Sequence, residues 1–191
     1  AEQPRAVVGL IEAARREAGD DMELMVDGLW SADVKLAIGL VRELERFGVF
    51  FVEEPLVSDN LPAYRRLSRS VNARIACGEQ LAGLFEFEQL IREGDVDIVQ
   101  PDLSRAGGLT EARKLVTLVE QAGKLLIPHA WTSDLLTAAS LHLNAYQNHP
   151  VFQEFCTNDS PLSRELAVNP LRLDGDGYLT VPHGPGLGIE V

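Results

Sequence analysis

The sequence is poor in basic residues and contains no long hydrophobic run. Its 191 residues include 17 Lys and Arg against 29 Asp and Glu, which gives a formal net charge of −12. Proteins that bind duplex nucleic acid normally carry the opposite charge, so we expect no nucleic-acid partner. No apolar run approaches the roughly 18 residues that a membrane-spanning helix requires, so we also expect no membrane segment.

Cysteine is scarce as well. Cys77 and Cys156 lie far apart and form no Cys-x-x-Cys motif, so we expect both to be buried, reduced thiols. Reduced thiols are usual in the cytoplasm, which is where we expect this protein. Hydrophobic residues make up 46% and charged residues 24% of the chain, and these ordinary values exclude a disordered protein.

Short apolar segments alternate regularly with amphipathic ones. Six apolar segments, rich in β-branched and aromatic residues, predict buried parallel strands at residues 22–26, 49–52, 75–77, 96–99, 125–127 and 151–153. The polar residues that end them are Asp27, Glu53, Glu79, Asp102, His129 and Glu154.

The amphipathic segments predict helices. Over residues 32–47 apolar side chains recur with helical spacing, with Ser31 suited to the N-cap and Gly48 to the C-cap. Residues 110–122 repeat this design, with Thr110 as the N-cap. Weaker helical patterns occur at residues 6–17, 60–69, 84–93 and 134–147.

The strand ends recur about every 25 residues. One strand and one helix per repeat indicate an α/β fold, either a TIM-type (β/α) barrel or a doubly wound sheet. The dinucleotide fingerprint GxGxxG is absent, which favours the barrel. A barrel needs eight strands and about 250 residues. We therefore expect residues 1–191 to be the C-terminal part of a catalytic barrel that is N-terminally incomplete, with about six strands present.

The first three predicted strand ends are all carboxylates: Asp27, Glu53 and Glu79. Side chains at the carboxyl ends of barrel strands converge, and three like charges are unfavourable there unless a cation lies among them. Oxygen ligands favour Mg²⁺ over Zn²⁺. Alternatively, these are unrelated acidic residues at helix N-termini. Glu54 is a rival to Glu53, because neighbours on a strand face opposite ways, although the equal spacing favours Glu53.

Several motifs resemble the enolase superfamily, and within it the mandelate racemase subgroup, which includes acid-sugar dehydratases. They are Met25-Val26-Asp27, Val52-Glu53-Glu54-Pro55, Gly78-Glu79-Gln80, Gln100-Pro101-Asp102 with Gly107-Gly108, and Pro128-His129. The resemblance implies that Asp27, Glu53 and Glu79 are the Mg²⁺ ligands.

The resemblance also implies that His129 and Asp102 form a catalytic dyad. A carboxylate beside an imidazole fixes its tautomer and stabilises the imidazolium, which gives an acid/base group near neutral pH. Members without the dyad have Lys at the end of the sixth strand, whereas this chain has Asp102 and Leu103 there. Glu154 stands where the family has an acidic partner for the substrate carboxylate or enolate.

The sequence departs from the family pattern in two respects. Leu29 stands two residues after Asp27, where the subgroup usually has Asn. The family's Lys-x-Lys pair and its N-terminal capping domain would precede residue 1, and no Lys-x-Lys occurs in the 191 residues. We therefore expect the capping domain and the first barrel strands to be absent from this chain.

The resemblance implies a Mg²⁺-dependent enzyme that abstracts the proton α to a carboxylate through an enediolate intermediate. We expect a lyase that dehydrates an acid sugar to a 2-keto-3-deoxy acid, with a small-molecule carboxylate as substrate and a homo-oligomeric assembly. A racemase, an epimerase or a lactone cycloisomerase would use the same intermediate. The other alternative is a truncated fragment without catalytic activity.

Overall fold

The computed structural model describes residues 2–28, 31, 33–131, 133–158 and 165–191. The chain forms two compact units, of which the first comprises Ala1–Gly78 with Glu88–Ile98 and the second Glu79–Phe87 with Val99–Val191. None of the helices in the described segments has both the length and the apolar character needed to cross a membrane.

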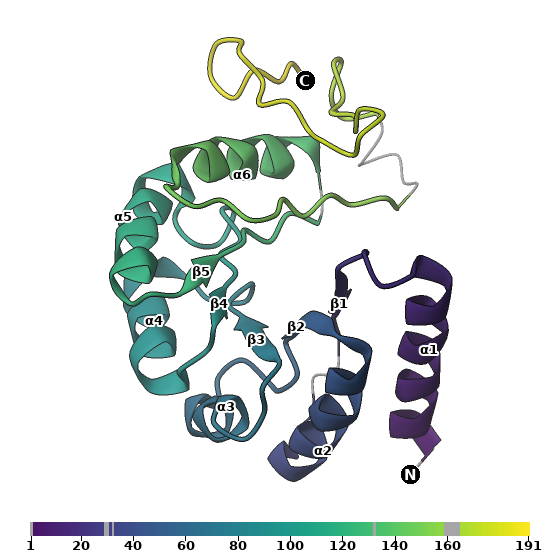
Figure 1. Cartoon of the computed structure of the whole chain (residues 1–191). Coiled ribbons are helices and arrows are strands. Elements are labelled where there is room, and N and C mark those ends of the chain that lie inside the picture. The colour runs from purple at the N-terminus through teal and green to yellow at the C-terminus, as the bar shows by residue number, and fades with distance from the viewer. Residues whose placement is uncertain (1, 29–30, 32, 132, 159–164) are drawn as a thin grey trace. The chain divides into compact units, whose positions relative to one another are not determined.

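Strands and helices alternate along the chain (Figure 1). In chain order the elements are α1 (Glu2–Ala18), β1 (Leu24–Val26), α2 (Val34–Leu44), a 3-10 turn (Glu45–Phe47), β2 (Val49–Glu53), α3 (Leu61–Ser68), β3 (Arg74–Cys77), α4 (Gly83–Gln89), a π-helical turn (Leu90–Gly94), β4 (Ile98–Val99), α5 (Gly108–Gln121), β5 (Leu125–Leu126) and α6 (Asp134–Tyr146). The predicted α/β alternation is therefore confirmed.

The strands follow one another in the sheet in the order β1-β2-β3-β4-β5. In the first unit β2 pairs in parallel with β1 and with β3, and the backbone N–H of Asp97 donates to the carbonyl of Ile75 at 3.0 Å. In the second unit the N–H of Ile127 donates to the carbonyl of Val99 at 3.1 Å. Parallel neighbours in chain order place the carboxyl ends of successive strands at the same edge of the sheet.

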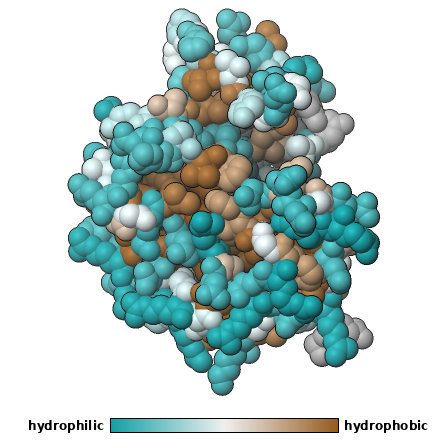
Figure 2. Space-filling view, in the orientation of Figure 1, coloured by the Kyte–Doolittle hydropathy of each residue, from teal (hydrophilic) through white to brown (hydrophobic). Residues whose placement is uncertain are grey.

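Each unit has an apolar interior made by its strands and one face of its helices. In α2 the buried residues recur every three or four positions, namely Ala37, Leu40, Val41 and Leu44. In α5 they are Ala112, Leu115, Val116 and Val119. This spacing gives each helix one apolar stripe, and its remaining faces carry polar side chains. Figure 2 shows a largely hydrophilic surface on which apolar side chains are visible in patches.

The predicted strand at residues 151–153 is not formed, so the described residues contain five strands where we expected about six. The side chain of Asn144 binds this segment. Its Nδ2 donates to the carbonyl of Phe152 at 3.0 Å and to Oε1 of Gln153 at 2.9 Å. Side-chain bonds to the backbone of this kind compete with strand pairing.

Two predicted helix starts are wrong. The N-cap of α2 is Asp33, whose carboxylate accepts from two N–H groups of the first turn at 2.8 and 3.3 Å, and not Ser31. The N-cap of α5 is Gly107 at φ 95°, not Thr110. Glycine suits this start, because a Cβ there would lie 2.8 Å from the Glu111 side chain. The prediction for Gly48 is confirmed, since it ends the 3-10 turn after α2 with φ 62°.

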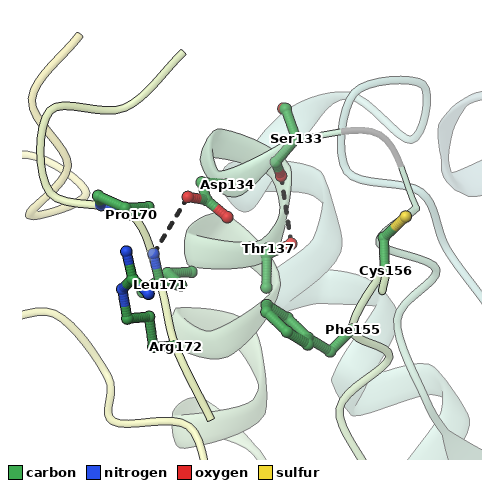
Figure 3. Close-up of a pocket in the computed structure, with 8 residues that line it drawn as sticks. All are labelled: Ser133, Asp134, Thr137, Phe155, Cys156, Pro170, Leu171 and Arg172. Atoms are coloured by element: carbon green, nitrogen blue, oxygen red, sulfur yellow. Dashed lines mark hydrogen bonds between the residues drawn. The ribbon is translucent and has the colours of Figure 1, made fainter. Parts of the chain in front are cut away.

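In the second unit the C-terminal segment is attached to α6. The buried Asp134 carboxylate accepts from the N–H of Leu171 at 3.1 Å, and Nε2 of His142 donates to the carbonyl of Leu187 at 3.3 Å. Figure 3 shows Asp134 directed toward Leu171 beside a small pocket of about 100 Å³. The side chains of Asp134 and His142 thus bind the C-terminal segment to α6.

Removing the Asp134 carboxylate is expected to loosen the C-terminal segment. The substitution Asp134→Ala leaves the Leu171 N–H without its charged acceptor, which typically costs about 1.5–3 kcal/mol of unfolding free energy. Denaturant unfolding should show this loss, and limited proteolysis should cleave residues 165–191 sooner than in the parent. Asp59→Ala, at an exposed position, is the matched control. Equal unfolding free energies for the Asp134→Ala variant and the parent would contradict this role.

Candidate active site

His129 and Asp102 form a hydrogen-bonded pair in the second unit. They lie beyond the carboxyl ends of β5 and β4 and are joined by a parallel β-bridge. Nδ1 of His129 donates to Oδ2 of Asp102 at 2.9 Å. The other carboxylate oxygen, Oδ1, accepts from the backbone N–H of Ser104 at 2.8 Å and from its hydroxyl at 2.5 Å. Both oxygens of Asp102 are thus engaged, which fixes the orientation of the imidazole.

Two further carboxylates act on His129. Oε2 of Glu79 lies 3.4 Å from Nε2 of His129, and Oε1 of Glu79 accepts from the Gln80 side chain at 2.7 Å. Oε2 of Glu154 accepts from the N–H of Ala130, the residue after His129, at 2.6 Å. Four of the six predicted site residues therefore gather within one unit.

These surroundings favour the charged form of the imidazole. Burial lowers the pKa of His129, but the hydrogen bond with Asp102 and the negative charges of Glu154 and Glu79 raise this pKa to about 9. Burial raises the pKa of Asp102, yet its hydrogen bonds with His129 and Ser104 hold it below the usual value. An imidazolium oriented in this way can give a proton to a departing group.

The other two predicted ligands belong to the first unit. Asp27 directly follows β1 and is exposed, whereas Glu53 is the last residue of β2 and is 7% exposed. Glu54, the rival to Glu53, is 1% exposed and accepts hydrogen bonds from Ser58, Tyr64 and the N–H of Gly78. This network gives Glu54 a structural position and favours Glu53 as the candidate ligand.

The chemistry of the predicted ligands fits Mg²⁺. All three side chains are carboxylates, which are the hard oxygen donors that Mg²⁺ prefers. Asp27 and Glu53 lie in the first unit and Glu79 in the second. Among the residues that the structure describes, no three His, Cys, Asp or Glu side chains are grouped as a metal site. The ligand set is therefore supported by donor chemistry and remains a prediction.

Sequence reasoning missed the residues that orient the predicted ones. Ser104 holds Asp102, and the spacing of these two residues, an Asp followed two positions later by a backbone donor, is typical of an Asx turn. Gln80 holds Glu79 and also accepts from Nη1 of Arg105 at 2.9 Å. Leu29, the unusual residue after Asp27, lies outside the described residues.

Neither cysteine forms a disulfide within the described part of the chain. Cys77 is buried as predicted. The prediction for Cys156 is wrong, because it is only partly buried. Cys156 lines the pocket shown in Figure 3 and belongs to a segment without regular secondary structure.

Fold and site together define a class of protein: a parallel β/α enzyme scaffold with a His–Asp pair and acidic residues at strand ends. The family model described as "Enolase C-terminal domain-like" matches residues 1–191, and the chain belongs to this family. The resemblance inferred from the sequence motifs is thereby confirmed, as is the barrel-type fold class.

The relatives of this chain include enzymes that act on sugar acids. It is 35% identical over 190 residues to a D-galactarolactone cycloisomerase from Agrobacterium fabrum, covering 95% of this chain and 50% of that protein. It is 32% identical over 192 residues to a D-galactonate dehydratase from Cronobacter sakazakii, covering 97% and 50%. The chain thus spans about half the length of the curated relatives it matches.

One of the solved structures similar to this chain contains a bound metal ion. The chain superposes with a TM-score of 0.88 on a racemase from Streptomyces coelicolor A3(2) with bound magnesium. The two are 29% identical, and the match covers 98% of this chain and 49% of the racemase.

Proposed function

We propose that this chain provides His129 and the metal ligands of a Mg²⁺-dependent enzyme that dehydrates a sugar acid to a 2-keto-3-deoxy acid. The observation that carries the proposal is the His129–Asp102 pair, 2.9 Å apart, with the Glu79 carboxylate 3.4 Å from the other imidazole nitrogen. A D-galactonate dehydratase among the relatives supports dehydration as the reaction.

His129 acts as the general acid in this proposal. Its Nδ1 is occupied by Asp102, so Nε2 is the nitrogen that can serve the substrate. The Cα–H bond breaks as a base takes its proton, and the C–O bond to the β-hydroxyl breaks as Nε2 protonates the departing oxygen, releasing water. The resulting enol takes up a proton at the former β-carbon and loses the proton of its hydroxyl group, which gives the 2-keto-3-deoxy acid. The family resemblance assigns the base to the Lys-x-Lys pair, which these 191 residues do not contain.

Asp27, Glu53 and Glu79 are the proposed metal ligands. Mg²⁺ bound by them would polarise the substrate carboxylate and so make the α-proton more acidic. The racemase structure with bound magnesium supports this choice of metal. Glu154 holds the backbone beside His129, and we propose that it also contacts the substrate carboxylate or enolate.

The second candidate function is lactone cycloisomerisation. It is favoured by the 35% identity to a D-galactarolactone cycloisomerase, slightly above the 32% identity to the dehydratase. Both reactions begin with removal of the α-proton, so the same dyad and ligands serve either one. We also propose a reducing compartment such as the cytoplasm, because the sequence has only two cysteines, far apart in the chain.

A product assay tests the proposal. The longest chain encoded in the reading frame that contains these residues is incubated with a panel of sugar acids and their lactones, with Mg²⁺ or with EDTA. We expect a 2-keto acid, detected as its semicarbazone, in the Mg²⁺ samples alone. A rearranged lactone without 2-keto acid would instead establish the cycloisomerase. No turnover of any compound by the folded, Mg²⁺-loaded protein would contradict both functions.

A further inference from the structure

The first unit contains a buried carboxylate that the proposed chemistry does not use. Glu54 is 1% exposed, and three groups from different parts of the unit donate to its carboxylate. Oε2 accepts from the Ser58 hydroxyl at 2.9 Å and from the Tyr64 hydroxyl at 3.2 Å. Oε1 accepts from the backbone N–H of Gly78 at 3.1 Å. A buried carboxylate is unfavourable without such partners, so these three donors stabilise the buried charge of Glu54.

Two of these groups make the network directional. Burial, together with Cys77 and Glu54 nearby, raises the pKa of Tyr64, so the phenol keeps its proton and remains a donor. The Tyr64 hydroxyl lies 2.8 Å from the carbonyl of Leu56 as well, so its one proton is shared between two acceptors. The N–H of Gly78, by contrast, donates to the other carboxylate oxygen, Oε1.

The backbone at Glu54 is strained. Its φ is 39°, in the left-handed region that residues with a Cβ seldom adopt. The surrounding contacts must hold it there, and strain of this kind is found preferentially at functional sites. The N–H of Glu54 also donates to the carbonyl of Ala76 at 3.1 Å. Backbone and side chain of one residue thus bind β3 and the residue that follows it.

These bonds act on the residues beside two proposed ligands. Glu54 directly follows Glu53, and Gly78 directly precedes Glu79. The bonds from Glu54 to Ala76 and Gly78 fix the end of β2 relative to the end of β3, all within the first unit. Any shift between these two strand ends would move the backbone from which Glu53 projects.

We infer that Glu54 is a positioning residue that holds Glu53, at the end of β2, in place against the end of β3, and thereby supports Mg²⁺ binding. The inference rests on the proposed function, because it assumes that Glu53 is a ligand. Residues that hold metal ligands in place typically contribute about 10–100-fold to metal affinity. Glu54 has this effect without contacting the metal.

The substitution Glu54→Gln tests the inference at nearly constant volume. It replaces one charged oxygen with an NH₂ group. Only the hydroxyls of Ser58 and Tyr64 can accept from this group, so the amide oxygen faces the N–H of Gly78, whose acceptor is then neutral. We expect Mn²⁺, used as the EPR-visible substitute for Mg²⁺, to bind about 10–100-fold more weakly to the folded variant. We also expect the Gly78 amide, in metal-free protein, to exchange with solvent about tenfold faster, since its hydrogen bond to a charged group becomes a weaker one to a neutral group.

Two controls separate positioning from packing. Tyr64→Phe removes a hydroxyl but keeps the bond between Glu54 and Gly78, so it should lower stability while leaving Mn²⁺ affinity near that of the parent. Glu43→Gln removes an exposed carboxylate that pairs with Arg46. It should change neither quantity. All variants are compared at a temperature at which circular dichroism shows each to be folded.

The outcomes distinguish this inference from the proposed function. If the parent binds Mn²⁺ and the folded Glu54→Gln variant binds it equally well, the positioning inference is overturned alone. Unchanged exchange at Gly78 in that variant also overturns it, with or without metal. If the parent does not bind Mn²⁺ at all, the proposed metal site fails, and the positioning inference fails with it.

Discussion

Replacing His129 with asparagine is expected to lower turnover by about 10²–10⁴-fold, the usual cost of losing general acid–base catalysis. Asparagine keeps a polar side chain near Asp102 but has no proton to give to a departing hydroxyl. Mg²⁺ affinity should stay close to that of the parent, because His129 is not a proposed ligand. Steady-state kinetics and Mg²⁺ titration of the variant and the parent measure these two quantities separately.

The control for this experiment is His149→Asn, at an exposed position of the second unit. It should leave turnover unchanged. Near-parental turnover in the His129→Asn variant would end the assignment of the dyad. Loss of metal binding from that variant would make His129 a ligand and would point to a transition metal.

Replacing Glu79 with glutamine is expected to weaken both Mg²⁺ binding and turnover. The substitution removes a charged oxygen donor from the proposed ligand set, so the loss of affinity should exceed the roughly 10–100-fold effect of residues that only orient ligands. Turnover at saturating substrate should recover in part as the Mg²⁺ concentration rises. Isothermal titration with Mg²⁺ and activity at several Mg²⁺ concentrations measure the two effects.

Glu86→Gln is a matched control in the segment after Glu79. The Glu86 carboxylate accepts from the backbone N–H of Ala82 at 2.7 Å, so this change also removes a bonded carboxylate in the same region. It should alter stability alone. Parental Mg²⁺ affinity in the Glu79→Gln variant would remove Glu79 from the ligand set.

The alternation of strands and helices was predictable because it depends on local pattern. The stripe of α2 recurs with a period of 3.6 residues, and β2 is a short continuous apolar run. Both elements form within a few residues of their predicted bounds. The approach of His129 to Asp102 follows from the same pattern, since adjacent parallel strands bring their carboxyl ends together.

Features that depend on single side-chain contacts were not predictable. The carbonyl of Phe152 accepts a hydrogen bond from the Asn144 side chain, and this apolar segment does not form the predicted strand. The N-cap of α2 is Asp33. Ser and Asp are about equally good N-cap residues, so residue type alone does not decide between Ser31 and Asp33. Similarly, the partners of Glu54 lie up to 24 residues away, and no spacing rule reveals them.

The central claim is that the protein removes the proton α to a carboxylate only when Mg²⁺ is present. Proton NMR of sugar acids such as D-galactonate, incubated with the protein in D₂O, tests it directly. With Mg²⁺, the account predicts loss of the α-proton signal and a 2-keto-3-deoxy product with one deuterium at C3, and with EDTA it predicts neither. Identical spectra with Mg²⁺ and EDTA, across a panel of sugar acids and with the protein folded, would contradict it.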